Sequence, residues 1–147
     1  MRVGIDTSVL IGLLDSRDIW HAAAVALDKA LKTSGAELAV FDCTVAEAVS
    51  TLARRLHEKR READLNALLD QLLVDFPAES ILWVFPDVPF LYVEVINMVR
   101  SSGGELNFND ALIAISCRNR RIPLLASFDA DFDHLAWLRR VTQPDDL

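Results

Sequence analysis

Short apolar runs alternate along this chain with longer segments in which apolar residues recur at helical spacing. The runs are bounded by polar residues, glycine or proline, which is typical of buried strands, and they cover Arg2–Ile5, Glu37–Phe41, Ser80–Phe85, Leu124–Ala126 and Leu138–Val141. The longer segments predict helices over residues 9–14, 19–31, 44–61, 62–76, 88–100 and 111–117. Strands that alternate with helices predict a three-layer α/β/α fold, in which right-handed crossovers join a mostly parallel sheet.

Acidic side chains follow several of these strands or open the helices after them. Asp6 ends the first strand, and Asp129 lies just beyond the fourth. Glu47 lies in the first turn of a helix, where Thr44 and Glu47 have the spacing of a capping box. Asp110 lies in the first turn of a later helix. Taken singly, each acid has a structural explanation as a helix cap or part of a turn.

Taken together, the acids predict a metal site. The loops that follow parallel strands gather at one edge of the sheet, so we expect Asp6, Glu47, Asp110 and Asp129 to lie near one another. Carboxylates without an intervening Lys or Arg repel each other by about 1 kcal/mol or more per close pair at intermediate dielectric. A cluster of this kind usually holds a hard divalent cation, and ligation by oxygen alone suits Mg²⁺ or Mn²⁺ rather than zinc.

Other acid-bearing α/β enzymes do not match these motifs. A phosphatase of the haloacid dehalogenase type needs a second Asp two positions after the first, where this chain has Ser8. A response-regulator receiver needs adjacent acids before the first helix and a Lys after the last strand. The chain also lacks a glycine-rich phosphate loop, a Gly-x-Ser-x-Gly elbow and a His-Glu-x-x-His motif.

The composition predicts one globular domain over residues 1–147. Hydrophobic residues make up 52% of the chain, which leaves apolar surface for a partner. No apolar run is long enough to cross a bilayer and no signal peptide opens the chain, so we expect a cytoplasmic protein without membrane contact. The lone thiols of Cys43 and Cys117 fit a reducing compartment and receive no role.

The net charge of −7 argues against nucleic-acid binding by the surface as a whole. Positive charge is concentrated near the end of the third predicted helix, at Arg54, Arg55, Lys59, Arg60 and Arg61. Such a run is usually a solvated helix end that complements the dipole. It is also the candidate patch for guiding an RNA backbone toward the acids.

Four segments in order resemble the signatures of PIN-domain nucleases, and most closely the VapC-type toxins of toxin–antitoxin pairs. They are Ile5–Leu10, the helix around Glu47, Asn109–Ala114 and Leu125–Phe132. The resemblance spans essentially the whole chain and implies a five-stranded parallel sheet between helices, a metal-dependent endoribonuclease and inhibition by a cognate antitoxin. It also implies that Asp6, Glu47, Asp110 and Asp129 bind the metal, with Asp131 as an auxiliary acid and Thr7 and Ser127 as supporting hydroxyls.

Two helix caps and one interface complete the expectations. Asn107 is positioned to cap the helix that holds Asp110, and Asp131 to cap a short helix from Phe132 to Leu135. On that assignment Asp129 binds the metal and Asp131 supports it. The apolar excess, together with Trp20, Trp83 and Trp137, predicts a homodimer and an antitoxin contact, which the family resemblance also implies.

Two other functions remain open from the sequence. One is a housekeeping RNA-processing nuclease of the same family without an antitoxin. The other is a PIN-like module that binds RNA or protein without cutting, which the intact set of acids disfavours. The RNA target is not predicted, because specificity depends on loops and on the placement of basic residues.

Overall fold

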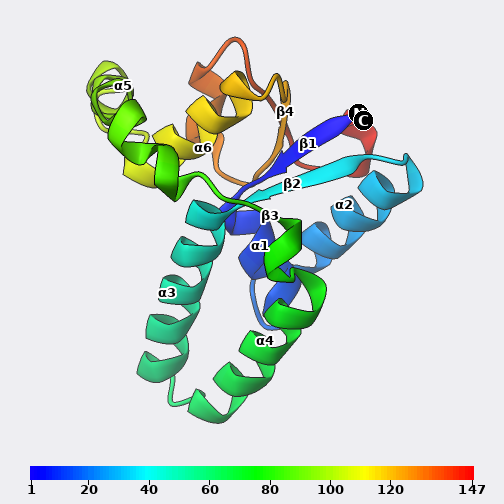
Figure 1. The fold of residues 1–147 in the computed structure, drawn as a ribbon. Helices are drawn as coiled ribbons and strands as arrows, with labels where there is room; N and C mark the ends of the chain where they lie inside the picture. Colours follow the sequence, from blue (N-terminus) through cyan, green and yellow to red (C-terminus); the bar gives the residue numbers. More distant parts are fainter.

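The computed structural model describes residues Met1–Leu147 and contains a five-stranded, all-parallel sheet of order β3-β2-β1-β4-β5 (Figure 1). The strands are β1 (Arg2–Ile5), β2 (Glu37–Phe41), β3 (Ile81–Leu82), β4 (Leu124–Ala126) and β5 (Arg139–Val141). The helices are α1 (Thr7–Leu14), α2 (His21–Thr33), α3 (Asp42–Glu58), α4 (Glu62–Asp75), α5 (Val88–Ser101) and α6 (Phe108–Asn119). The expected α/β fold with a parallel sheet is confirmed.

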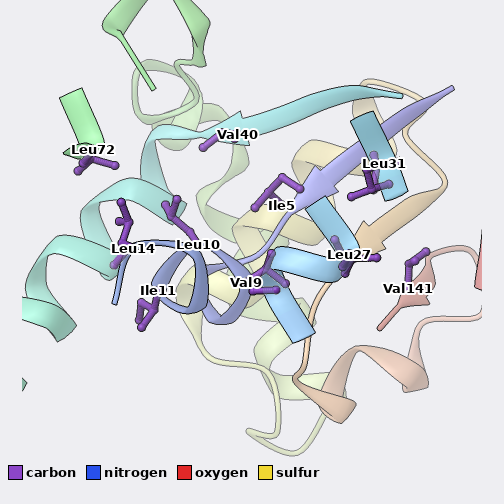
Figure 2. Packing of buried hydrophobic residues seen from close by; sticks show 14 of the residues in the cluster. Ile5, Val9, Leu10, Ile11, Leu14, Leu27, Leu31, Val40, Leu72 and Val141 are labelled. Carbon is purple, nitrogen blue, oxygen red and sulfur yellow. The ribbon is translucent and has the colours of Figure 1, made fainter. Parts of the chain in front are cut away.

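Helices cover both faces of the sheet, so the strands are buried on both sides. Val3 and Ile5 of β1 face a core built mainly with α1 and α2, where Figure 2 shows Val9 and Leu27 beside Ile5. Leu125 of β4 faces a second core built with α5 and α6. Two buried faces explain why the strands appear in the sequence as continuous apolar runs rather than alternating ones.

Gly4 allows α6 to pack directly on β1. A Cβ atom at this position would lie 2.8 Å from Cys117 Sγ of α6, closer than two such atoms can approach. Any side chain at position 4 would therefore push α6 away from the sheet. Because α6 carries Asp110 in its first turn, this close packing fixes one of the expected site residues relative to the end of β1.

Two boundary predictions and one predicted helix cap were wrong. The predicted strand Ser80–Phe85 pairs only at Ile81 and Leu82, because the next residues turn so that the amides of Val84 and Phe85 donate to the buried Asp42 carboxylate. Helix α3 begins at Asp42 rather than at Thr44. The predicted capping box is therefore absent, since the helix has already started before Thr44.

The side chains freed from that box have other contacts. Thr44 Oγ1 donates 3.2 Å to the carbonyl oxygen of Ile5 and so ties α3 to the end of β1. Glu47 is left to accept a hydrogen bond from a different element, described below. Helices α3 and α4 then extend away from the sheet as a pair (Figure 1). None of the helices combines the length and apolarity needed to cross a bilayer.

Candidate active site

The structure brings all four expected acids to one cavity at the carboxyl-terminal edge of the sheet. The cavity has a volume of about 200 Å³ and opens between the ends of β1 and β4, the first turns of α1 and α6, and one side of α3 beyond its first turn. Its lining consists of hydroxyl, amide and carboxylate side chains with one apolar and one basic residue: Asp6, Thr7, Ser8, Ile11, Glu47, Thr51, Arg55, Asn107, Asp110 and Asp129.

Asp6 is held by the turn that leaves β1. Its Oδ2 atom accepts hydrogen bonds from Ser8 Oγ at 2.7 Å, from Ser127 Oγ at 2.8 Å and from the Ser8 amide at 3.3 Å. Asp6 is almost fully buried, and burial raises its pKa although these hydrogen bonds act in the opposite direction. None of these three hydrogen bonds involves the Oδ1 atom.

Glu47 and Asp110 are held in the same way from neighbouring helices. Thr7 Oγ1 donates to Glu47 Oε2 at 3.2 Å, which links α1 to α3. Asp110 forms the capping box of α6: its Oδ2 atom accepts from the Asn107 amide at 2.9 Å, and its own amide donates to Asn107 Oδ1 at 2.9 Å. The predicted cap at Asn107 is confirmed.

Asp129 follows β4 and has two tasks. Its amide donates to Ser127 Oγ at 3.0 Å, and its Oδ1 atom accepts from the Asp131 amide at 2.9 Å. Asp129 is therefore the cap of the short 3₁₀ helix Ala130–His134. The prediction that Asp131 caps this helix was wrong, because Asp131 lies inside the helix and its side chain neither forms a hydrogen bond nor lines the cavity.

The four acids share one arrangement. In each carboxylate a single oxygen accepts hydrogen bonds from the protein, while the other has no donor: Asp6 Oδ1, Glu47 Oε1, Asp110 Oδ1 and Asp129 Oδ2 are free. The bound oxygens fix the orientation of the side chains, and the free ones are available to a ligand.

The negative charges also act on one another. The pKa of Asp110 is raised to about 7, first by burial and then by the charges of Asp6, Glu47 and Asp129. No three side chains of the His, Cys, Asp or Glu type come close enough in this structure to hold a metal ion among them. The donor chemistry nevertheless fits a hard divalent cation, because the cavity offers free carboxylate oxygens and neither His nor Cys.

The basic residues are not one patch. Arg55 lines the carboxylate cavity and pairs with Asp18 at 3.2 Å, whereas Arg54 has no acidic partner within 4.0 Å. Arg61 is largely buried by ion pairs with Asp15 at 3.2 Å and Asp64 at 2.8 Å.

The remaining two positive charges lie at the far end of α3. Lys59 and Arg60 follow its last turn, about 20 Å along the helix axis from Glu47 at a rise of 1.5 Å per residue. Any contact they make with a ligand would therefore be remote from the carboxylates.

Two structural residues escaped the sequence prediction. Ser8 supports Asp6 and also accepts the Phe128 amide at 3.0 Å, so it joins the loops after β1 and β4. A hydroxyl two residues after a strand-terminal Asp is a recognisable signal for such a turn. Asp42 follows β2 as the first residue of α3 and does not line the cavity, because its carboxylate accepts hydrogen bonds from the amides of Val84 and Phe85.

A parallel α/β fold with this carboxylate cavity defines a class, and comparison with known proteins identifies it. The model of the PIN domain matches residues 3–138, so this chain belongs to the PIN domain family. A search of curated protein sequences found no relative.

Two solved structures share the fold. One is a chain from the structure of VapBC2 of Rickettsia felis, which is bound to a DNA fragment from its promoter. This chain is 17% identical to it, with a TM-score of 0.68, and the alignment covers 96% of this chain and 98% of that chain. The other is VapC20 of Mycobacterium tuberculosis, described as a toxin that cleaves the sarcin-ricin loop, with 21% identity, a TM-score of 0.67 and coverage of 91% and 95%. The resemblance to VapC-type PIN domains is thus confirmed for the fold.

Proposed function

We propose that this protein is an endoribonuclease that hydrolyses RNA phosphodiester bonds with the help of Mg²⁺ or Mn²⁺. The observation that carries the proposal is the arrangement of Asp6, Glu47, Asp110 and Asp129, each with one fixed and one free carboxylate oxygen beside a single cavity. Membership of the PIN domain family supports a nuclease, and the VapC20 structure is that of an RNA-cleaving toxin.

The residues of the chain have distinct parts in this proposal. Asp6, Glu47, Asp110 and Asp129 hold the cation, and Asp131 is an auxiliary acid outside the cavity. When bound, a divalent ion neutralises phosphate charge and acidifies water. Hydroxyl groups keep the acids oriented, as Thr7 does for Glu47 and as Ser127 and Ser8 do for Asp6.

The proposal is tested by cleavage of single-stranded RNA with Mg²⁺, with Mn²⁺ and with chelator. We expect cleavage only with metal, and its loss in Asp6→Asn and Asp110→Asn, which keep the size of the side chain and an oxygen acceptor. Asp133→Asn is the matched control, since Asp133 is exposed, pairs with Arg140 and does not line the cavity. Cleavage in chelator, or full activity of either site variant, would contradict the metal assignment.

We further propose that the protein is a homodimer and the toxin of a type II toxin–antitoxin pair. The VapBC2 neighbour supports an antitoxin partner. Apolar surface is also present: Trp83 is 58% exposed and Leu73 of α4 is 69% exposed, which is typical of surfaces that a partner covers. Trp20 stacks on Phe128 and remains partly exposed, so it combines a packing role with accessible surface.

The toxin assignment has its own test. A small protein encoded beside this gene should co-purify with it and suppress its RNA cleavage. Cleavage of RNA without any such partner would instead favour a housekeeping RNA-processing nuclease. Binding of RNA with no cleavage under any metal condition would favour the non-cleaving module.

A further inference from the structure

We propose that a second pocket, beside the carboxylate cavity, holds one unpaired base of the RNA and selects it by the side chains of Phe85, Asn109 and Arg54. The pocket has a volume of about 220 Å³ and shares Glu47 and Thr51 with the carboxylate cavity. This inference rests on the proposed nuclease function. It concerns which base is selected next to the phosphodiester bond that would be cleaved.

The shared residues place the pocket next to the reacting phosphate. Glu47 and Thr51 lie one helical turn apart on α3 and line both cavities. On the far side, Asn109 precedes Asp110 in the first turn of α6. A strand whose phosphate lay at the carboxylates would therefore have its neighbouring nucleotide at this pocket.

Phe85 supplies an aromatic surface on a fixed backbone. Its amide donates 2.9 Å to Oδ2 of the buried Asp42, which also accepts the Val84 amide at 2.9 Å. The ring is 43% exposed and stacks on no aromatic side chain of the protein. An unpaired base has a π-face that can stack on such a ring, whereas both faces of a base inside a duplex are already stacked on neighbouring bases.

Asn109 and Arg54 supply polar groups without partners in the protein. The side-chain amide of Asn109 forms no hydrogen bond within the protein. The neighbouring Asn107, in contrast, uses its side-chain oxygen to cap α6. An asparagine side chain offers one acceptor and a donor group, which suits the edge of a base. Arg54 has no acidic partner, unlike Arg55 and Arg61, so its guanidinium is available for the phosphate of the same nucleotide.

The combination favours RNA over a protein partner. A stacking surface, a base-edge group and a phosphate-binding cation occur together, and they adjoin a cavity that has the chemistry of phosphodiester hydrolysis. Because stacking accepts any base while hydrogen bonding to an edge discriminates between bases, the two side chains should contribute in different ways. Phe85 should raise affinity for every sequence, and Asn109 should create the preference.

The test measures binding rather than cleavage. Fluorescein-labelled single-stranded RNA hexamers that differ only at one central base are titrated with protein in Ca²⁺, after a gel has shown that they stay intact. We expect wild type to distinguish the four hexamers. Phe85→Ala should weaken all four about tenfold, the scale of one lost base–aromatic stack, and keep their ranking. Asn109→Ala should bring the four dissociation constants together.

Matched controls separate these effects from general damage. Phe90→Ala removes an exposed aromatic ring of α5 and Asn66→Ala an exposed amide of α4, both outside the pocket; neither should change affinity or ranking. Arg54→Gln should weaken all four hexamers and reduce the dependence of binding on salt.

The outcomes also separate this inference from the proposed function. Unchanged binding in Phe85→Ala, or an unchanged ranking in Asn109→Ala, would overturn the base pocket even if wild type cuts RNA normally with Mn²⁺. Differential binding as expected, in a protein that cuts no RNA with any metal, would support the pocket and refute the nuclease. Equal binding of all four hexamers by wild type would refute base selection.

Discussion

The strongest physical prediction concerns the stability of the metal-free protein, because Asp110 is largely buried and shares its cavity with the charges of Asp6, Glu47 and Asp129. Its pKa is raised from the usual 3.8 to about 7 in the folded state. Between these values the folded protein keeps a proton that the unfolded chain has released. The free energy of unfolding should therefore fall as the pH rises through this window and level off above about pH 7.

The size of the effect follows from the shift. One excess proton in the folded state gives a slope of about 1.4 kcal/mol per pH unit. Water at the open side of the cavity screens part of the repulsion, so we expect a loss of about 1–2 kcal/mol between about pH 5 and pH 8. Asp6 adds to the same slope, because burial raises its pKa as well.

The assay is urea unfolding in chelator at several pH values, for wild type and Asp110→Asn. Asparagine keeps an oxygen that can accept the Asn107 amide of the capping box but carries no charge. Subtracting the free energies of unfolding of the two proteins at each pH cancels the contributions of the titrating groups that both contain. We expect the variant to have the smaller slope and to gain less stability from added Mg²⁺ or Mn²⁺.

The control is Asp133→Asn. The pKa of Asp133 is lowered by its hydrogen bond and charge contact with Arg140, so this group titrates below the tested range. The variant should be less stable at every pH tested, with an unchanged slope. Equal slopes in wild type and Asp110→Asn would refute the raised pKa of Asp110, and with it the idea that burial and the neighbouring carboxylates disfavour its charged form in the metal-free fold.

Three further predictions follow from the contacts. Asp129→Ala should abolish metal-dependent activity and also cost about 1 kcal/mol in chemical unfolding, because Asp129 caps the 3₁₀ helix; Asp131→Ala should leave stability unchanged, and the reverse order would refute the assignment. Arg55→Gln should lower the salt dependence of RNA binding by about one logarithmic unit per lost phosphate contact, whereas the remote Arg60→Gln should not. Sedimentation should show a dimer that Trp83→Ala weakens, and a strict monomer at high concentration would contradict the interface.

The order of strands and helices and the gathering of the acids were predictable because they depend on patterns that the sequence carries locally. Apolar runs and helical spacing identify the elements, and the handedness of parallel crossovers places every strand end at the same edge. Asp6 and Asp110 could thus be assigned to one site although they lie far apart in the chain. No knowledge of side-chain orientation was needed for that step.

The hydrogen-bond partners were less predictable, because several residues compete for each role. Thr44 and Glu47 have the spacing of a capping box, but the helix starts earlier, and the two side chains bind Ile5 and Thr7 on other elements instead. The basic run was divided in the same way. Arg61 forms ion pairs with Asp64, three residues further along the chain, and with Asp15 at the end of α1, whose proximity depends on the tertiary fold.

Asp129 shows why these partner assignments matter for function. The sequence predicts the metal site at Asp129 and the helix cap at Asp131, but the Asp129 carboxylate both caps the helix and lines the cavity. Its Oδ1 atom holds the helix that follows β4, and its Oδ2 atom faces no donor in the protein. Without the cap, the Asp129 side chain would be free to rotate away from the metal. Without the metal, the cap would still hold the charged Asp129 side chain in place. The same division between one structural oxygen and one free oxygen recurs in all four acids, so the fold positions the carboxylates against their repulsion before any cation arrives.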